Sequence, residues 1–409
     1  MTEQLQDAAT KTGGCPIDLW SDHFNENFWT EINRLQESGE LAVHMQGSTP
    51  CYVATRYEDN FKILRDWKRF SSEDGVAILG HDNRSEPPKN EGRFLPEDLD
   101  PPAQTDWRKV LNPELTEQKM RRFIPSIRAS VDALLDAGIA KGSFRVMEDF
   151  LRPLQLKSVF TNILNLGDDR IDDWMKWGHD IFVGETAEDS ANAYTSLYNA
   201  INDLIEERTQ NPIEGDLVSL VCHVKEIDGK EPTRSERIAV VLPLAIAGLE
   251  STGTVLGGTI HHLATHPDDL AELVADPSLV PAAVEEGLRM FTNVTVLQRT
   301  TTCPVQIGNT ELDKGAKVWT SYNAANRDPA KFPDPHTWNL HRKDKNHLAF
   351  SIGPHRCLGS NYARVMMLTV LERLIERIPR FTLAPDQVIE YHSMPTRGIH
   401  EFMITVQPN

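Results

Sequence analysis

The sequence predicts mostly helices together with a few short strands. Residues 114–230 carry successive apolar patterns separated by polar turns, which is typical of consecutive helices. A longer pattern of the same kind runs from Thr233 to His266. Two hairpin signals, at Gly47-Ser48 and at Gly308-Asn309, each separate two runs of strand-forming residues. Helices therefore predominate, and strands form a smaller part.

The composition is that of an ordinary globular protein. Of the 409 residues, 40% are hydrophobic and 25% are charged. The 42 basic and 60 acidic side chains give a net charge of −18, which disfavours a nucleic-acid partner because phosphates attract basic surfaces. The apolar run Ile238 to Leu249 is too short to cross a bilayer, and the N-terminus lacks the features of a signal peptide. We therefore expect a cytoplasmic, bacterial protein with no membrane partner.

The five cysteines argue against a disulfide framework and against structural zinc. They are widely spaced and form no C-x-x-C pair. This usage fits a reducing compartment. The cysteines are Cys15, Cys51, Cys222, Cys303 and Cys357.

The first hundred residues mix regular and irregular structure. Residues 1–35 are expected to form a polar lead into a helix, and residues 40–56 a hairpin. Residues 70–100 are rich in Gly, Pro, Glu and Asn and predict a long irregular loop of the kind that forms lids or binding loops. Its apolar islands, Val76 to Leu79 among them, either line a pocket or anchor the loop. Pro101 then opens a helix.

The pattern from Thr233 to His266 predicts one long helix with polar residues in its middle. Thr233 and Glu236 form a capping box, and Pro267 ends the pattern. The helix would be roughly 45–50 Å long at about 1.5 Å per residue. The segment Ala247-Gly-Leu-Glu-Ser-Thr252 sets a carboxylate and two hydroxyls in an apolar run, where buried charge is costly unless it is paired or functional. A bent helix whose hydroxyls bind backbone carbonyls is the alternative.

Cys357 lies in a Gly- and Pro-rich turn within residues 348–364, directly before an amphipathic helical pattern. A thiolate at a helix N-terminus is stabilised by the helix dipole, so we expect a lowered thiol pKa. Such a sulfur is a nucleophile or a metal ligand. The alternative is a small buried hydrophobic residue.

The whole pattern favours the metal ligand. Phe350-x-x-Gly353-x-x-x-Cys357-x-Gly359, followed by Ala363-Arg364, resembles the haem-binding signature of the cytochrome P450 family. The resemblance implies that Cys357 is the axial thiolate of the iron of haem b. It also implies that Phe350 and Gly359 adjoin the cofactor.

The resemblance also implies the fold class. It predicts a mainly α protein with a small β-rich lobe, in which residues 1–409 form a single haem-thiolate monooxygenase domain. The haem would lie between the long helix, at about 234–266, and the haem loop 348–364.

Two further motifs match this family. Ala247 to Thr252 resembles its oxygen-activation motif, with Glu250 in the acidic position and Ser251 where threonine is usual. Serine lacks the methyl group that fixes a threonine rotamer, so proton delivery is either looser or shared with Thr252. Glu286 and Arg289 resemble the E-x-x-R pair behind the haem, which is structural. Thr337 stands where the third partner of this pair is usual, so His336 or Arg342 would substitute.

The resemblance assigns the haem propionates to cationic side chains. Arg108, Arg299 and His355 would hold them through charge-assisted hydrogen bonds. Gln104 stands where histidine is commoner in the family.

The implied reaction is monooxygenation with O₂ and two electrons. The enzyme would hydroxylate or dealkylate a small, largely apolar molecule, such as a terpenoid or an aromatic. Electrons would come from NAD(P)H through a reductase and a ferredoxin. The expected pocket residues are Val76, Ile78, Leu79, Leu244, Val294 and Val296. The expected ferredoxin-docking residues are Arg108, Lys109, Lys119, Arg121, Arg122, Arg356 and Arg364.

Two other functions remain open at this point. One is a haem-thiolate enzyme that uses peroxide, or an isomerase that needs no external electrons. The other is a non-catalytic haem sensor.

Overall fold

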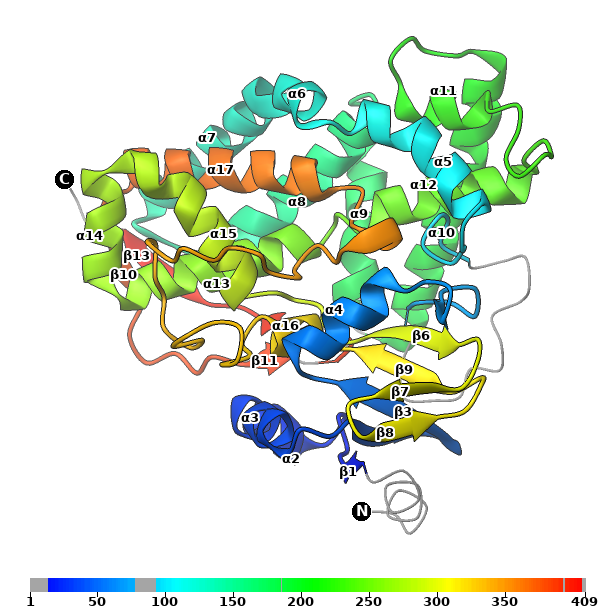
Figure 1. Ribbon diagram of the computed structural model, residues 1–409. Coiled ribbons are helices and arrows are strands. Elements are labelled where there is room, and N and C mark those ends of the chain that lie inside the picture. Colours follow the sequence, from blue (N-terminus) through cyan, green and yellow to red (C-terminus); the bar gives the residue numbers. More distant parts are fainter. Residues whose placement is uncertain (1–13, 78–92, 185, 393, 407–409) are drawn as a thin grey trace.

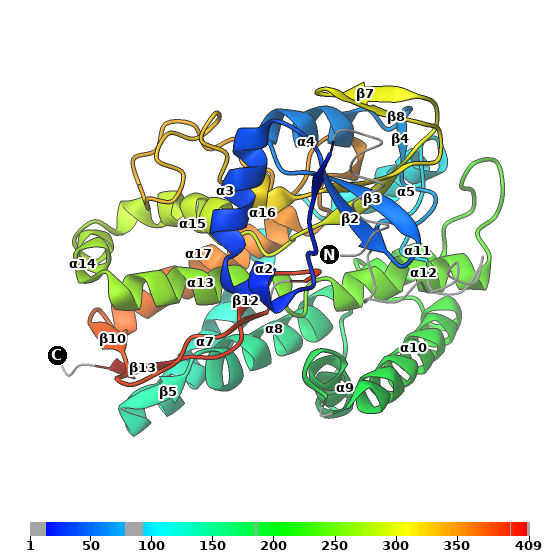
Figure 2. The same ribbon diagram turned by 90° about the horizontal axis from the view of Figure 1, so that it is seen from below.

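The computed structural model describes residues 14–77, 93–184, 186–392 and 394–406. Its helices form one large body, and a sheet with the N-terminal helices forms a smaller lobe beside it (Figure 1; Figure 2). This arrangement is the mainly α fold with a small β-rich lobe that the sequence motifs imply.

The large body contains twelve α-helices among the described residues. In chain order they are α5 (Ala103–Leu111), α6 (Glu117–Met120), α7 (Ile124–Lys141), α8 (Arg152–Ser158), α9 (Ile171–Val183), α10 (Ala187–Gln210), α11 (Leu217–Cys222), α12 (Arg234–Ile246), α13 (Ser251–Thr265), α14 (Pro267–Ala275), α15 (Val280–Met290) and α17 (Ser360–Arg377). The large hydrophobic core lies among these helices.

The small lobe is built on a six-stranded sheet with the order β1-β2-β3-β9-β6-β4. The strands are β1 (Cys15–Pro16), β2 (Ala42–Gln46), β3 (Thr49–Ala54), β4 (Phe70–Ser71), β6 (Leu297–Thr301) and β9 (Lys317–Thr320). Strands β2 and β3 form the hairpin predicted at Gly47, whose φ of 60° favours glycine. Strands β3 and β9 pair in parallel and bring together two segments that are far apart in the sequence.

Smaller sheets complete the strand set. The hairpin predicted at Gly308 is formed by β7 (Val305–Ile307) and β8 (Thr310–Leu312). A three-stranded sheet joins β10 (Phe381–Leu383), β13 (Met403–Val406) and β5 (Ser143–Arg145). Strands β11 (Tyr391–His392) and β12 (Gly398–Ile399) pair with each other.

The described N-terminal residues are not the polar lead that the sequence predicted. Helices α2 (Asp22–Glu26) and α3 (Phe28–Ser38) bury Phe24, Phe28 and Leu35 in a core shared with the sheet residue Trp319. The aromatic and aliphatic residues are spaced along one face of these helices, so polar residues remain on the outer face. Two further helices, α4 (Tyr57–Arg65) and α16 (Tyr322–Ala325), pack against each other, and α4 also contacts strand β9.

The predicted long helix is interrupted. Its capping box at Thr233 and its end before Pro267 are confirmed, but residues 247–250 form a turn between α12 and α13. The interruption is tolerated because side chains bind backbone carbonyls there: Ser251 Oγ donates to the Ala247 carbonyl at 2.8 Å, and Gln155 Nε2 to the Gly248 carbonyl at 3.2 Å. The bent-helix alternative thus describes the backbone of this segment.

The stretch Arg234–Thr265 is the one helical run of the described residues that is long and apolar enough to cross a membrane. Most of its apolar side chains pack in the hydrophobic core.

Candidate active site

The loop that carries Cys357 is fixed by backbone contacts on both sides. The Cys357 N–H donates to the Phe350 carbonyl at 2.8 Å, and α17 begins three residues later at Ser360. Gly353 has a φ of +70°, and a Cβ atom there would lie 2.7 Å from the Leu64 carbonyl oxygen. Only glycine therefore lets this loop pack against α4.

Cys357 is accessible to solvent although protein surrounds its sulfur. Burial raises the pKa of the Cys357 thiol, while a hydrogen bond from Gly359 and the charges of Arg108 and Arg356 lower it. The net direction is upward, so the expectation of a lowered thiol pKa is wrong for the protein without a bound metal: desolvation outweighs the helix N-terminus.

Several buried nitrogen atoms near this sulfur have no hydrogen-bond partner among the described residues. Arg108 buries Nε and Nη2 with no hydrogen-bond partner among the described residues, and the same holds for His355 Nδ1. Burial, followed by the charges of Arg299 and Arg108, lowers the pKa of His355 to about 3. These side chains therefore surround a place that an anionic group would fill.

These residues fit haem with its two propionates. A free, accessible thiol can ligate the iron, and the unpaired donors of Arg108 and His355 can bind carboxylates. Arg299 is also buried and already donates Nη1 to the Gln298 carbonyl at 2.7 Å.

Gln104 does not lie free beside these donors. It is buried, and its Nε2 donates to the carbonyl of Pro354, so that it ties α5 to the Cys357 loop. The structure thus shows Gln104 holding the loop, and its predicted place beside the cofactor stays a prediction.

Sequence reasoning missed a buried carboxyl in this region. Glu97 lies beside Arg108, and burial raises the pKa of Glu97 to about 7 although the Arg108 charge lowers it. Its Oε2 has no partner among the described residues. Glu97 belongs to the irregular segment and no pattern marks it in the sequence.

The turn at residues 247–250 holds a second group of polar side chains. Burial raises the pKa of the Glu250 carboxyl, while the charges of Arg152 and His400 lower it. Ser251 Oγ is engaged with the Ala247 carbonyl, whereas no hydrogen bond of the Thr252 hydroxyl is found in the described part of the chain. Arg152 was also missed, although it stands alone in the apolar run 150–154.

Behind the Cys357 loop, buried carboxylates are fully paired. Arg289 binds Glu286 through Nε at 2.9 Å and Nη2 at 2.8 Å, and Arg342 Nε binds both Glu286 oxygens at 3.2 Å. Of the two candidate third partners, Arg342 therefore contacts Glu286, while His336 contacts Asn33 and Arg327.

A second carboxylate, Glu285, adjoins the same loop. It accepts hydrogen bonds from Arg364 Nε at 2.6 Å and from His347 Nε2 at 3.1 Å. Burial alone would raise the pKa of Glu285, but these two partners lower it to about 2.

The expected pocket residues differ in how far they are exposed. Leu244 and Val294 are half-buried, which leaves part of each side chain accessible. Val296 is 1% exposed and packs in the N-terminal core, so the structure removes it from the pocket. The backbone of Val76 anchors its loop to Gln298 and Asp98, and its side chain is buried. Ile78 and Leu79 lie outside the described residues.

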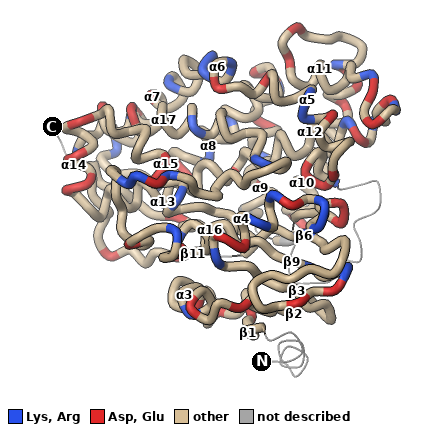
Figure 3. Tube along the Cα trace, viewed as in Figure 1, with Lys and Arg blue, Asp and Glu red and all other residues tan. Residues whose placement is uncertain are grey.

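Most of the expected docking cations are not free. Arg108 buries its guanidinium. Lys109 pairs with Asp106, Lys119 with Glu114, Arg121 with Glu117, and Arg364 with Glu285. Figure 3 shows acidic residues next to basic ones along α5 and α6. This surface therefore lacks the concentrated positive charge that the sequence predicted.

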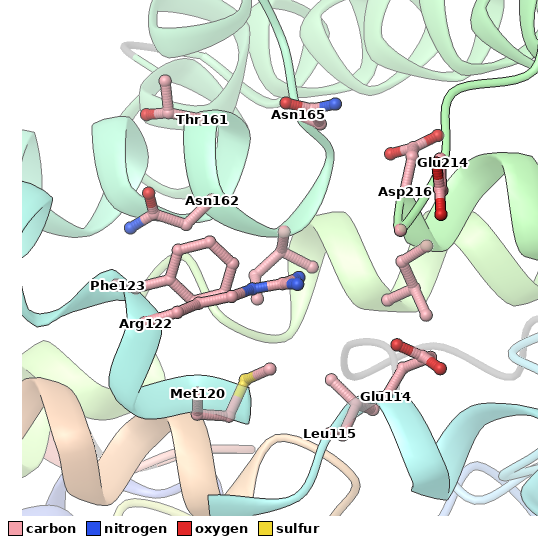
Figure 4. Close-up of a pocket in the computed structure, with 13 residues that line it drawn as sticks. Glu114, Leu115, Met120, Arg122, Phe123, Thr161, Asn162, Asn165, Glu214 and Asp216 are labelled. Atoms are coloured by element: carbon pink, nitrogen blue, oxygen red, sulfur yellow. The ribbon is translucent and has the colours of Figure 1, made fainter. Parts of the chain in front are cut away.

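A separate cavity lies between α6, the segment 159–165 and the loop before α11 (Figure 4). Arg122 lies in it against the ring of Phe123 at 4.6 Å, and Glu114, Glu214 and Asp216 contribute carboxylates. No group of three potential metal-ligating His, Cys, Asp or Glu side chains occurs in the described part of the chain. Because it contains neither Cys357 nor Glu250, this cavity is separate from the candidate site.

Known proteins resemble this chain along most of its length. It is 29% identical over 403 residues to cytochrome P450 107B1 of Saccharopolyspora erythraea. The matched region covers 96% of this chain and 98% of that protein. It is 29% identical over 402 residues to 6-deoxyerythronolide B hydroxylase of the same organism, covering 93% and 96%. The steroid C26-monooxygenase of Mycolicibacterium smegmatis is 30% identical over 344 residues, covering 82% of each chain.

Solved structures agree with these relatives. The cytochrome P450 CYP109Q5 of Chondromyces apiculatus superposes with a TM-score of 0.86 at 26% identity, covering 97% of this chain and 99% of that one. A mutant of P450 EryK in complex with erythromycin B gives 0.81 at 25% identity, covering 94% and 97%. The cytochrome P450 family model matches residues 142–401. The chain therefore belongs to the cytochrome P450 family and is a bacterial P450 monooxygenase.

Proposed function

We propose that Cys357 ligates the iron of haem b and that the enzyme hydroxylates or dealkylates an apolar organic molecule. The observation that carries this proposal is the convergence of an accessible thiol with buried, unpaired donors of Arg108 and His355. A chain that left these donors without acceptors would lose stability unless a ligand supplied them. The bound haem supplies oxygen activation.

The residues around Cys357 prepare the site for the cofactor. Arg108, His355 and Arg299 hold the two propionates by charge-assisted hydrogen bonds. The Gly359 N–H donates to the sulfur and stabilises its anionic form. Glu286, Arg289 and Arg342 keep the loop in position from behind.

Glu250 and the adjacent hydroxyls move protons in this proposal. Burial raises the pKa of the Glu250 carboxyl, so this group holds a proton to higher pH than an exposed carboxyl does and can donate it to a neighbouring hydroxyl. Ser251 Oγ is already committed to the Ala247 carbonyl. Thr252 is therefore the more available hydroxyl, and we propose that it shares or carries the relay.

The substrate class is the least constrained part of the proposal. Half-buried Leu244 and Val294 favour an apolar molecule such as a terpenoid or an aromatic. The relatives named for a steroid and for 6-deoxyerythronolide B extend the classes worth testing to steroids and macrolactones.

Electrons are proposed to come from NAD(P)H through a reductase and a ferredoxin, in the cytoplasm. The test is reconstitution of the haem-loaded protein with NADH, a ferredoxin reductase, a ferredoxin and O₂, using compounds that shift the Soret band as substrates. Hydroxylated or dealkylated product under these conditions supports the proposal. Equal product with peroxide alone would favour the peroxide-using enzyme, and tight binding without any product would favour a sensor.

A further inference from the structure

The cavity between α6, the segment 159–165 and the loop before α11 is unused by the candidate active site (Figure 4). Its volume is about 230 Å³. Pockets that hold drug-sized molecules usually measure about 300–1,000 Å³, so this cavity suits a smaller molecule. Part of its lining is apolar and consists of Leu115, Met120, Phe123, Ile163 and Leu217.

The walls of the cavity are fixed by hydrogen bonds that need no ligand. Asn361 Nδ2 donates to the Leu115 carbonyl at 2.8 Å, and Asn162 Nδ2 donates to Tyr362 Oη at 3.1 Å. Both bonds connect the lining to the first turn of α17. A preformed wall has little freedom to lose when a molecule binds.

Two carboxylates at the cavity are already balanced by cations. Glu114 pairs with Lys119 at 2.7 Å, and Asp216 Oδ2 lies 3.3 Å from Arg208 Nε and accepts the Ser219 hydroxyl at 2.7 Å. The other oxygen, Asp216 Oδ1, has no hydrogen-bond partner among the described residues, although the side chain is 0% exposed. Buried carboxylate oxygens normally accept hydrogen bonds, so this atom marks a place where a bound donor is expected.

One cation and one anion at the cavity have no charged partner. Arg122 makes no hydrogen bond or ion pair with the described residues, and its guanidinium lies over the Phe123 ring at 4.6 Å. Glu214 likewise has no ion pair in the described part of the chain. Figure 4 shows the Arg122 guanidinium on one side of the cavity and the carboxylates of Glu214 and Asp216 on another. A bound molecule can therefore meet one positive and one negative group at the same time.

We propose that this cavity binds a free α-amino acid with an apolar side chain. The α-carboxylate accepts hydrogen bonds from Arg122, and the α-ammonium group donates to Glu214 and Asp216. The side chain of the amino acid packs against the apolar lining. A purely cationic molecule is repelled by Arg122 and a purely anionic one by the carboxylates, so a zwitterion matches the cavity best. This site is separate from the haem and does not depend on the proposed function.

The test is isothermal titration calorimetry of the haem-loaded protein with L-leucine. Two probes of similar shape are compared with it: 4-methylpentanoate, which lacks the ammonium group, and 3-methylbutylamine, which lacks the carboxylate. Imidazole saturates the haem iron in every titration, so that amines cannot ligate it. We expect each probe to bind at least about tenfold more weakly than L-leucine, because each loses one charged hydrogen-bonding partner.

Variants assign the two charged ends of the amino acid. Arg122→Met and Glu214→Gln should each weaken L-leucine binding by at least about tenfold. Arg122→Met should leave the affinity for 3-methylbutylamine no weaker, and Glu214→Gln should do the same for 4-methylpentanoate. Arg121→Met and Glu117→Gln are the controls, since these two side chains pair with each other and do not line the cavity. The controls should change L-leucine binding by less than about twofold.

Three results would overturn the proposal. The first is no detectable binding of L-leucine, L-methionine or L-phenylalanine by the wild type. The second is 3-methylbutylamine or 4-methylpentanoate binding as tightly as L-leucine, which would show that only one charge is recognised. The third is an equal loss of affinity in the control variants, which would place the amino acid elsewhere on the protein.

Discussion

The two sides of the Cys357 loop differ in how their charges are partnered. Behind the loop, Glu286 is bound by Arg289 and Arg342, and Glu285 by Arg364 and His347. On the side of Arg108 and His355, by contrast, the buried atoms Arg108 Nε, Arg108 Nη2 and His355 Nδ1 have no partner among the described residues. Buried polar groups are normally satisfied, so the paired groups fit a structural role, and the unpaired donors beside Cys357 are available to a bound group.

This comparison predicts that the paired charges around Glu286 contribute to the free energy of unfolding. Glu286→Ala leaves two guanidinium groups buried without a carboxylate and should lower the free energy of unfolding by about 3–5 kcal/mol. Urea unfolding of the haem-loaded protein, followed by circular dichroism, measures it. Glu376→Ala, which removes an exposed carboxylate paired with Arg373, is the control and should cost less than about 1 kcal/mol. A similar loss of unfolding free energy in both variants would show that the buried ion pairs of Glu286 contribute no more than an exposed pair.

Glu285 adds a pH dependence to the same side. Because its pKa is lowered to about 2, the stability that it contributes is present above its ordinary pKa near 4.5 and is lost as the pH falls towards 2. The contribution is at most about 3 kcal/mol. Glu285→Gln should therefore flatten the difference in unfolding free energy between pH 5 and pH 2, measured by urea titration at each pH. If Glu285→Gln left this difference unchanged, the ionised form of Glu285 would not be stabilised by its partners.

At the turn of residues 247–250, Glu250 should affect turnover rather than folding. Glu250→Gln removes the proton-exchanging group and should slow product formation by about a hundredfold. The dissociation constant of a Soret-shifting substrate should stay within about twofold. Ser251→Ala and Thr252→Ala should each divert electrons to hydrogen peroxide, and the larger diversion identifies the hydroxyl of the relay. Normal coupling in all three variants would contradict the role of this turn.

The smallest change is expected for Arg108→Met. This variant tests directly whether the unpaired donors bind the cofactor or stabilise the fold. Arg108→Met removes unpaired donors, so the haem-free protein should keep its unfolding free energy within about 0.5 kcal/mol. Haem dissociation should accelerate about tenfold, because a charge-assisted hydrogen bond is lost. Haem transfer to apomyoglobin measures this rate, with Arg121→Met as the control. Destabilisation of the haem-free Arg108→Met protein would show that Arg108 is structural.

Features set by local sequence were predictable, and features set by distant partners were not. The hairpins at Gly47 and Gly308 and the capping box at Thr233 follow from residues a few positions apart, and all are present. The break at residues 247–250 depends in part on Gln155 of α8, which the local pattern could not show.

The candidate site divides in the same way. The Cys357 motif was evident because its residues are contiguous, whereas the burial of Glu97 and the contact of Arg342 with Glu286 arise only from tertiary packing. Val296 was predicted to line the pocket because of its place in the chain. In the structure it packs in the N-terminal core.

The central claim is a bond between the Cys357 sulfur and haem iron. The most direct measurement is the absorption spectrum of the purified, haem-loaded protein after reduction and addition of carbon monoxide, beside the same spectrum of Cys357→His. The account predicts a red-shifted thiolate Soret band in the wild type and its loss in the variant. A folded, haem-loaded wild type without that band, or a variant that keeps it, would contradict the account.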